Sequence, residues 1–203
     1  MFRVLDRYKG PSVQGNWEYW LTHPERDANN KYQAKYREQL AQRRELLGKR
    51  NNSIWLERFA RDTVRIFPET GKAEFTMFHG CSYECHRNSD YRPHPCECYL
   101  FPRDLNIVTR GLFGNGENLK TPHFLFGHTH TPGFFTYSVT SMVNMWQFFT
   151  TDMRNCPISY GNRGQRFGIN PGTAGIETKR FPRTAVLLDT AEKTFTYLVD
   201  IEG

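Results

Sequence analysis

The most informative stretch of this 203-residue chain is Pro122-His123-Phe124-Leu125-Phe126-Gly127-His128-Thr129-His130. A short apolar run that ends in glycine is typical of a buried strand that leaves its sheet through a turn. Gly127 has no Cβ, so the backbone can pass close to neighbouring atoms there. His128 and His130 can then diverge toward two adjacent metal ions, and neutral imidazole is a favoured ligand of several transition metals. The stretch therefore predicts a strand with metal ligands at its carboxyl end.

Other segments have the same character of a strand followed by a turn. We predict strands at 73–80, 122–128, 133–138 and 166–170, followed by a terminal hairpin made of 184–188 and 194–199. His79-Gly80 ends the first of these strands. Because loops at strand ends bring distant side chains together, we expect His79 to lie near His128 and His130.

The N-terminal third is predicted to be helical. Apolar residues keep helical spacing between 29 and 47, and Gly48 is expected to end this helix. Ser53 can cap a second helix. Its apolar stripe would consist of Ile54, Trp55, Phe59 and Val64. The two helices would form a hairpin that spans 24–67.

The composition favours a folded globular protein, since 38% of the residues are hydrophobic and 15% are aromatic. No apolar run approaches the roughly 20 residues that span a bilayer, and the first residues do not resemble a secretory signal. We therefore expect a cytoplasmic protein without a membrane partner. The formal charge of +6 suits a phosphate-bearing substrate, although much of the excess lies in 31–65, where a solvated helix face is the simpler interpretation.

Four motifs follow one another along the chain: Gly15-Asn16, His79-Gly80, Gly127-His128-Thr129-His130 and Asn170-Pro171-Gly172. Their order, from about residue 13 to the end, resembles that of calcineurin-like metallophosphoesterases, in particular the small phosphodiesterases. Gly-His-x-His is the most specific of the four. The resemblance implies an α/β fold, a four-layer α-β-β-α sandwich of two mixed sheets. Residues 1–203 would form one such domain, with the hairpin at 24–67 inserted in it.

The resemblance also implies a function and roles for single residues. The function would be hydrolysis of a phosphomonoester or phosphodiester at a centre of two divalent ions, which Mn, Fe, Zn or Ni could fill. Asn16, His79 and His128 would ligate one ion and His130 the other. Asn16, His128 and His130 would thereby take part in catalysis. The loop after Asn170-Pro171-Gly172 would approach the centre from one side.

The sequence departs from the family pattern at its N-terminal end. The family's Asp-x-His and Gly-Asp-x-x-Asp motifs do not occur before Gly15, and Asp6 is the only carboxylate before Glu18. Trp17 stands where many members have a histidine that protonates the leaving group. We therefore expect an N-terminally truncated domain that holds at most one ion well.

Two arginines near the C-terminus, Arg180 and Arg183, are candidate phosphate contacts because of their charge and placement. The partner would be a phosphoester: a cyclic nucleotide, a dinucleotide, a phosphoprotein or a nucleic-acid end. The sequence selects neither among these substrates nor an oligomeric state.

A cysteine cluster follows His79-Gly80. Cys81 and Cys85 precede His86, and His94 precedes Cys96 and Cys98, which together offer enough soft ligands for an accessory structural zinc. The spacing lacks the usual two-residue gap between paired cysteines, so a reduced surface loop is the favoured alternative. The odd total of five cysteines argues against a disulfide framework.

Two other function classes remain open at this stage. Basic and aromatic residues could make a nucleic-acid-binding module, although acidic residues are interleaved with them and no recognised motif of that class occurs. A catalytically inactive family member could instead serve as an interaction domain. Nucleic-acid binding with a steep salt dependence and no need of metal would favour the first of these.

Overall fold

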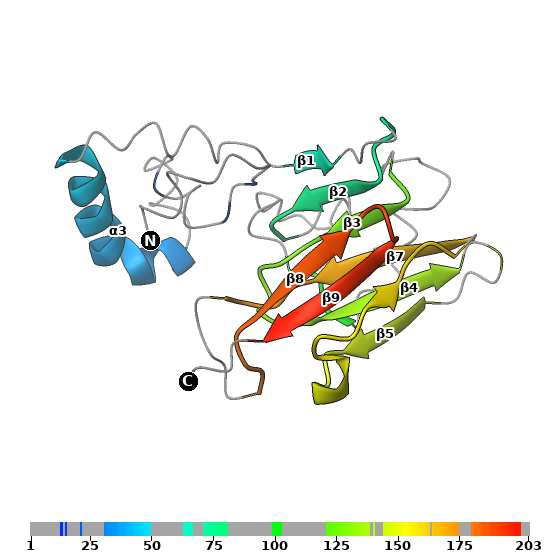
Figure 1. Ribbon diagram of the computed structural model, residues 1–203. Coiled ribbons are helices and arrows are strands. Elements are labelled where there is room, and N and C mark those ends of the chain that lie inside the picture. The colour runs from blue at the N-terminus through cyan, green and yellow to red at the C-terminus, as the bar shows by residue number, and fades with distance from the viewer. Residues whose placement is uncertain are drawn as a thin grey trace.

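The computed structural model describes residues 13, 15, 21, 31–49, 63–66, 71–80, 99–102, 121–138, 140, 144–162, 164–174 and 180–199. This part of the chain is mixed α/β, with helix α3 (Lys31–Lys49), a 3-10 turn η5 (Thr151–Met153) and two β-sheets (Figure 1). No helix in these ranges is long and apolar enough to cross a membrane.

The larger sheet has six strands in the order β1-β2-β3-β7-β4-β5. Their bounds are β1 Thr63–Ile66, β2 Phe75–Phe78, β3 His123–Leu125, β7 Gln165–Asn170, β4 Gly133–Ser138 and β5 Asn144–Phe148. The three central strands β2, β3 and β7 are parallel, and the outer ones run antiparallel to their neighbours. The carboxyl ends of β2, β3 and β7 therefore meet at one edge, where His79, Gly127–His130 and Asn170 are found.

The smaller sheet has the order β6-β9-β8, with β6 Ile158–Ser159, β9 Thr194–Val199 and β8 Thr184–Asp189. The tight turn between β8 and β9 is organised by Asp189, whose Oδ1 accepts hydrogen bonds of 3.0 Å from the backbone N–H groups of Ala191 and Glu192. The predicted terminal hairpin is confirmed, because turn and alternation are local properties of the sequence.

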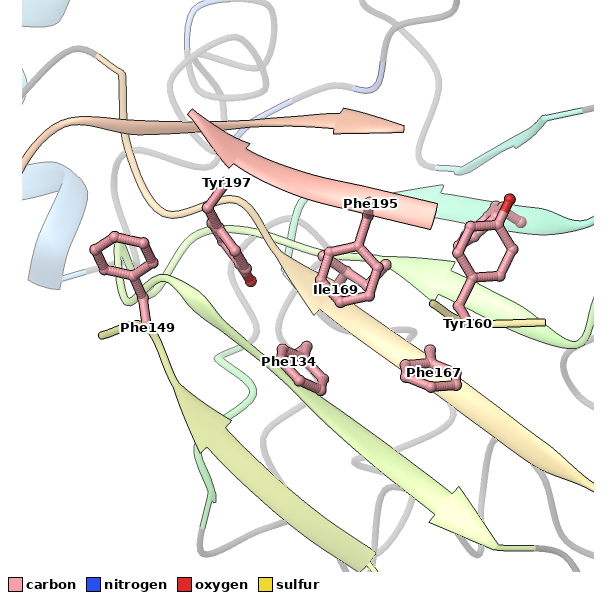
Figure 2. Close-up of a cluster of buried hydrophobic side chains, with 8 residues drawn as sticks. Phe134, Phe149, Tyr160, Phe167, Ile169, Phe195 and Tyr197 are labelled. Atoms are coloured by element: carbon pink, nitrogen blue, oxygen red, sulfur yellow. The ribbon is translucent and has the colours of Figure 1, made fainter. Parts of the chain in front are cut away.

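The hydrophobic core lies between the two sheets (Figure 2). Side chains alternate between the two faces of a strand, so the aromatic rings on one face of the large sheet point toward β9 of the small sheet. The cluster consists of Phe75, Phe134, Phe149, Tyr160, Phe167, Ile169, Phe195 and Tyr197. The opposite face of the large sheet carries a second buried aromatic group, Phe78, Phe124, Phe126 and Phe135.

A polar contact ties the two sheets together at the end opposite His79. Lys193, in the turn before β9, donates to both carboxylate oxygens of Glu74, just before β2, at 2.7 and 2.8 Å. The Tyr160 hydroxyl lies 3.5 Å from the same carboxylate. Burial, together with the negative charge of Glu74, raises the pKa of Tyr160, so that its hydroxyl stays a donor.

The strands expected at 73–80, 122–128, 133–138 and 166–170 are present, with the first two shorter than predicted. The helix expected at 29–47 is α3, which continues through Gly48 to Lys49. The assignment of Val64 to a second helix is wrong, because Val64 lies in β1 and pairs with Met77 of β2. Strands β5 and β6 were not predicted, and β6 is only two residues long, too short for an alternating pattern to indicate it.

Candidate metal centre

Two of the predicted ligands meet at the edge where the parallel strands end. His79 follows β2 and His128 follows β3, and these strands are neighbours in the sheet. The Nε2 atom of His79 lies 3.1 Å from the Nδ1 atom of His128. The two ring centroids are 4.9 Å apart at an angle of 59°. The structure thus brings together two imidazole nitrogens from residues 49 positions apart in the sequence.

The backbone between the two strands fixes this approach. The N–H of Gly127 donates to the carbonyl oxygen of His79 at 2.7 Å. A Cβ at Gly127 would stand 3.3 Å from that oxygen, which is tighter than most Cβ contacts. Glycine at this position therefore permits the close contact between the two loops.

The loop after β3, Gly127–His130, is called the histidine loop below, and its backbone has an unusual conformation. His128 and His130 have φ angles of 65° and 54°, in the left-handed region that disfavours residues with a Cβ. The N–H of Thr129 donates to the Gly127 carbonyl at 2.7 Å, which closes a tight turn. Strained positions of this kind gather at functional sites, where the surrounding structure must enforce them.

Asn170, at the end of β7, holds the loop that carries the two histidines. Its side-chain amide donates to the Thr129 hydroxyl at 2.8 Å, and its Oδ1 accepts from the N–H of Gly172 at 2.9 Å. Asn170 is fully buried, and its carbonyl accepts a 3.0 Å hydrogen bond from the hydroxyl of Tyr197 on β9. The sequence reasoning noted the Asn170-Pro171-Gly172 motif but did not assign this positioning role to its asparagine.

The electrostatics of His79 suit metal ligation. Burial, and then the charge of nearby His130, lower the pKa of His79 to about 4. His79 is therefore neutral at pH 7, the form that a metal ion needs. The side chain of His130, the ligand expected for a second ion, is exposed.

An aromatic residue that the sequence analysis did not single out lies against this pair. The ring of Tyr99 is centred 3.9 Å from that of His128, at 34°. Phe101 stacks on Tyr99 with centroids 5.4 Å apart and planes 6° apart. Leu100, between the two rings in sequence, is fully buried. The sequence offered only a run of large apolar residues at 99–101, which does not indicate a site by itself.

The donor set fits a transition metal in part. When two imidazole nitrogens bind the same ion, each at about 2.0–2.1 Å, they lie roughly 3–3.5 Å from each other. The distance of 3.1 Å between His79 Nε2 and His128 Nδ1 falls in that range. The same distance allows a hydrogen bond, with either nitrogen as donor. Within the described ranges, no group of three or more His, Cys, Asp or Glu residues converges on one point. Asn16 and the predicted zinc ligands Cys81, Cys85, Cys96 and Cys98 lie outside the described residues.

The two predicted phosphate contacts lie on the segment that leads into β8. The Arg180 guanidinium stands 5.2 Å from the ring centroids of both Phe148 and Phe181. Arg183 is exposed and precedes Thr184, whose hydroxyl donates to the Pro171 carbonyl at 2.7 Å. This hydrogen bond ties the start of β8 to the Asn170–Gly172 loop, and the role of both arginines toward phosphate stays a prediction.

Comparisons with known proteins add little to this geometry. No protein-family model matches the chain, and no curated protein matches it either. Among solved structures, it is similar to the crystal structure of a metallophosphoesterase from Sphaerobacter thermophilus, with 16% identity and a TM-score of 0.49. The match covers 71% of this chain and 51% of that one, so the chain spans about half the length of that protein. A likeness of this size assigns neither a family nor an activity.

Proposed function

We propose that this chain is a phosphoester hydrolase of the metallophosphoesterase type, in which His79 and His128 hold one divalent metal ion. The observation that carries the proposal is the 3.1 Å approach of His79 Nε2 to His128 Nδ1 at the ends of two parallel strands. The order of the four sequence motifs supports it, because it supplies both histidines in the expected places.

Each residue of the site has a separate task in this proposal. His79 and His128 hold the ion, and Asn16 and His130 are the further ligands expected from the motifs. Asn170 holds the histidine loop through Thr129. Imidazole donors suit Zn, Fe, Mn or Ni, and such an ion, when bound, supplies Lewis-acid stabilisation of the charge that develops on a phosphoester.

Arg180 and Arg183 are proposed to attract the phosphate group. The Arg180 guanidinium is placed by two aromatic rings, which leaves its N–H groups at the ring edges able to donate. Attraction of an anion by these side chains agrees with the chain's formal charge of +6.

The test is the metal content of the His128→Ala variant. We expect the affinity for Mn²⁺ or Zn²⁺ to fall by more than about 100-fold, because loss of a ligand costs more than the 10- to 100-fold typical of residues that only orient ligands. The full chain is loaded with metal, dialysed and analysed by mass spectrometry, with hydrolysis of bis(p-nitrophenyl) phosphate as a second readout.

Cys156→Ser is the matched control, because this exposed free thiol could bind metal adventitiously. The control should retain both metal and activity. Unchanged metal content in His128→Ala would sink the assignment. Binding of DNA or RNA by the metal-free chain, with a steep salt dependence, would favour the nucleic-acid-binding alternative instead.

A further inference from the structure

We propose that Tyr197, on β9 of the small sheet, is a positioning residue for the metal site, on which it acts through Asn170. The inference rests on the proposed function, since the His79–His128 pair is the site that it positions. It adds a residue of the aromatic core to a site whose other members lie at the strand ends of the large sheet.

The Tyr197 side chain extends from the small sheet toward the large one (Figure 2). Its ring is fully buried and packs against Phe149 and Phe195, with ring centroids 5.3 and 6.0 Å away. Its backbone is held as well, because it pairs with Val186 of β8 and its carbonyl accepts the N–H of Asn155 at 3.0 Å. The hydroxyl at the far end of the ring therefore has a fixed place.

The Tyr197 hydroxyl donates to the carbonyl oxygen of Asn170 at 3.0 Å. Burial raises the pKa of Tyr197, so the hydroxyl keeps its proton and stays a donor. The carbonyl belongs to the peptide bond between Asn170 and Pro171, at the end of β7. Because a peptide bond is planar, a fixed carbonyl also fixes the direction in which the chain leaves the sheet.

The side chain of Asn170 connects this carbonyl to the histidine loop. Its amide donates to the Thr129 hydroxyl at 2.8 Å. Thr129 lies between His128 and His130, whose left-handed backbone angles must be enforced by the surrounding structure. The hydrogen bonds that run from Tyr197 through Asn170 to Thr129 therefore connect the aromatic core with the loop that carries the ligands.

Tyr160 offers a matched comparison. Like Tyr197, it is a fully buried member of the core cluster. Its hydroxyl lies 3.4 Å from the Asp189 carbonyl and 3.5 Å from the Glu74 carboxylate, at the end of the sheets opposite His79. Tyr160→Phe and Tyr197→Phe each remove one buried hydroxyl and keep the ring. An effect that both variants share is therefore structural, and an effect of Tyr197→Phe alone reports positioning.

The first measurement is the Mn²⁺ affinity of the full chain by calorimetric titration. Tyr197→Phe should lower this affinity about tenfold, the lower end of the effect of residues that orient metal ligands, whereas Tyr160→Phe should keep it. On the Asn170→Ala background, Tyr197→Phe should change the affinity less than about twofold, because residues that act through one another are not additive.

The second measurement needs no metal. It follows, by NMR in the metal-free full chain, the hydrogen exchange of the Thr129 N–H, which donates to the Gly127 carbonyl at 2.7 Å. If Tyr197 holds the histidine loop, local opening should make this exchange about tenfold faster in Tyr197→Phe than in Tyr160→Phe.

The same Mn²⁺ affinity and the same Thr129 exchange in the two tyrosine variants would overturn the positioning role and leave the proposed function standing. A tenfold loss that persists on the Asn170→Ala background would overturn the route through Asn170. A parent chain that binds no Mn²⁺ would overturn the proposed function, whereas the exchange of the Thr129 N–H would still show whether Tyr197 holds the histidine loop.

Discussion

Left-handed backbone positions are a recurring feature of single residues around the site. His128 and His130 adopt such angles despite their Cβ atoms, and Gly172 does so with a φ of 80°. The cost for a residue with a Cβ is roughly 1–2 kcal/mol. The two histidines therefore carry backbone strain, whereas Gly172 does not because it lacks a Cβ. A Cβ at Gly172 would also be too close to neighbouring atoms.

Gly172→Ala should destabilise the protein more than Gly164→Ala. Both glycines have nearly the same φ, 80° and 78°, so both substitutions carry the same backbone cost. A Cβ at Gly172 would also clash with the Thr184 hydroxyl and with Pro132, whereas one at Gly164 would meet nothing within 4 Å. Urea unfolding should show an additional loss of about 1–3 kcal/mol for Gly172→Ala. An equal loss of unfolding free energy in the two variants would mean that the backbone around Gly172 can shift to make room for the Cβ.

At the scale of elements, the exits of three parallel strands make the site. The β3 exit carries the histidine loop, the β2 exit carries His79, and the β7 exit carries Asn170. The hydrogen bonds of Asn170 connect the β7 exit with the β3 exit through Thr129 and with the small sheet through Tyr197. The loops are therefore supported by neighbouring elements rather than by their own sequence alone.

Asn170→Ala should weaken both the fold and metal binding. It removes the partner of Thr129 Oγ1 and the acceptor of the Gly172 N–H, which costs about 1–3 kcal/mol in a buried setting. Without the hydrogen bond from Asn170 to Thr129, the histidine loop loses its orientation. The affinity for Mn²⁺ or Zn²⁺ should therefore fall about 10- to 100-fold.

Calorimetric titration with metal and urea unfolding measure the two effects of Asn170→Ala separately. Asn162→Ala is the control, because Asn162 is exposed and its side chain hydrogen-bonds the nearby, exposed Gln165 at 3.5 Å. A variant that loses stability but keeps the metal affinity of the parent chain would show that Asn170 is purely structural.

At the scale of the whole molecule, two sheets face each other across an aromatic core. His123 is buried in it, next to the rings of Phe75 and Tyr160, and its Nδ1 accepts the N–H of Phe167 at 3.1 Å. Burial, and then the charges of Lys193 and Arg166, lower the pKa of His123 to about 4. The neutral ring is therefore part of the folded state.

Acidification should destabilise the metal-free protein between about pH 6.5 and pH 4. In this window the unfolded chain protonates its histidines and the folded chain does not protonate His123, so the free energy of unfolding falls as pH falls. His123 alone should account for about 3 kcal/mol. Urea unfolding of His123→Gln at pH 7 and pH 4.5 should show a smaller loss than the parent chain. An equal loss in both would contradict the burial of a neutral His123.

Much of the architecture could be predicted from the sequence because its signals are local. Alternation and turn residues located most strands of both sheets, and helical spacing located α3. Val64 was assigned to a helix because a single apolar residue fits the pattern of a helix and that of a short strand equally well. Its pairing with Met77 of β2 shows that it belongs to a strand. The glycine and histidine pattern of 127–130 likewise indicated a turn, which the hydrogen bond from the Thr129 N–H to the Gly127 carbonyl confirms; metal ligation by its histidines stays a prediction.

What the sequence determined by itself was the type of element and the chemistry that each could carry, since these depend on neighbours a few residues away. The motifs at the strand ends also led us to expect His79 near His128, and the two rings do meet. Only the tertiary structure showed the contacts of Asn170 with Thr129 and of Tyr99 with His128, because no local pattern relates residues so far apart in the sequence. The low pKa of His79 arises in the same way, since burial exists only after the chain has folded.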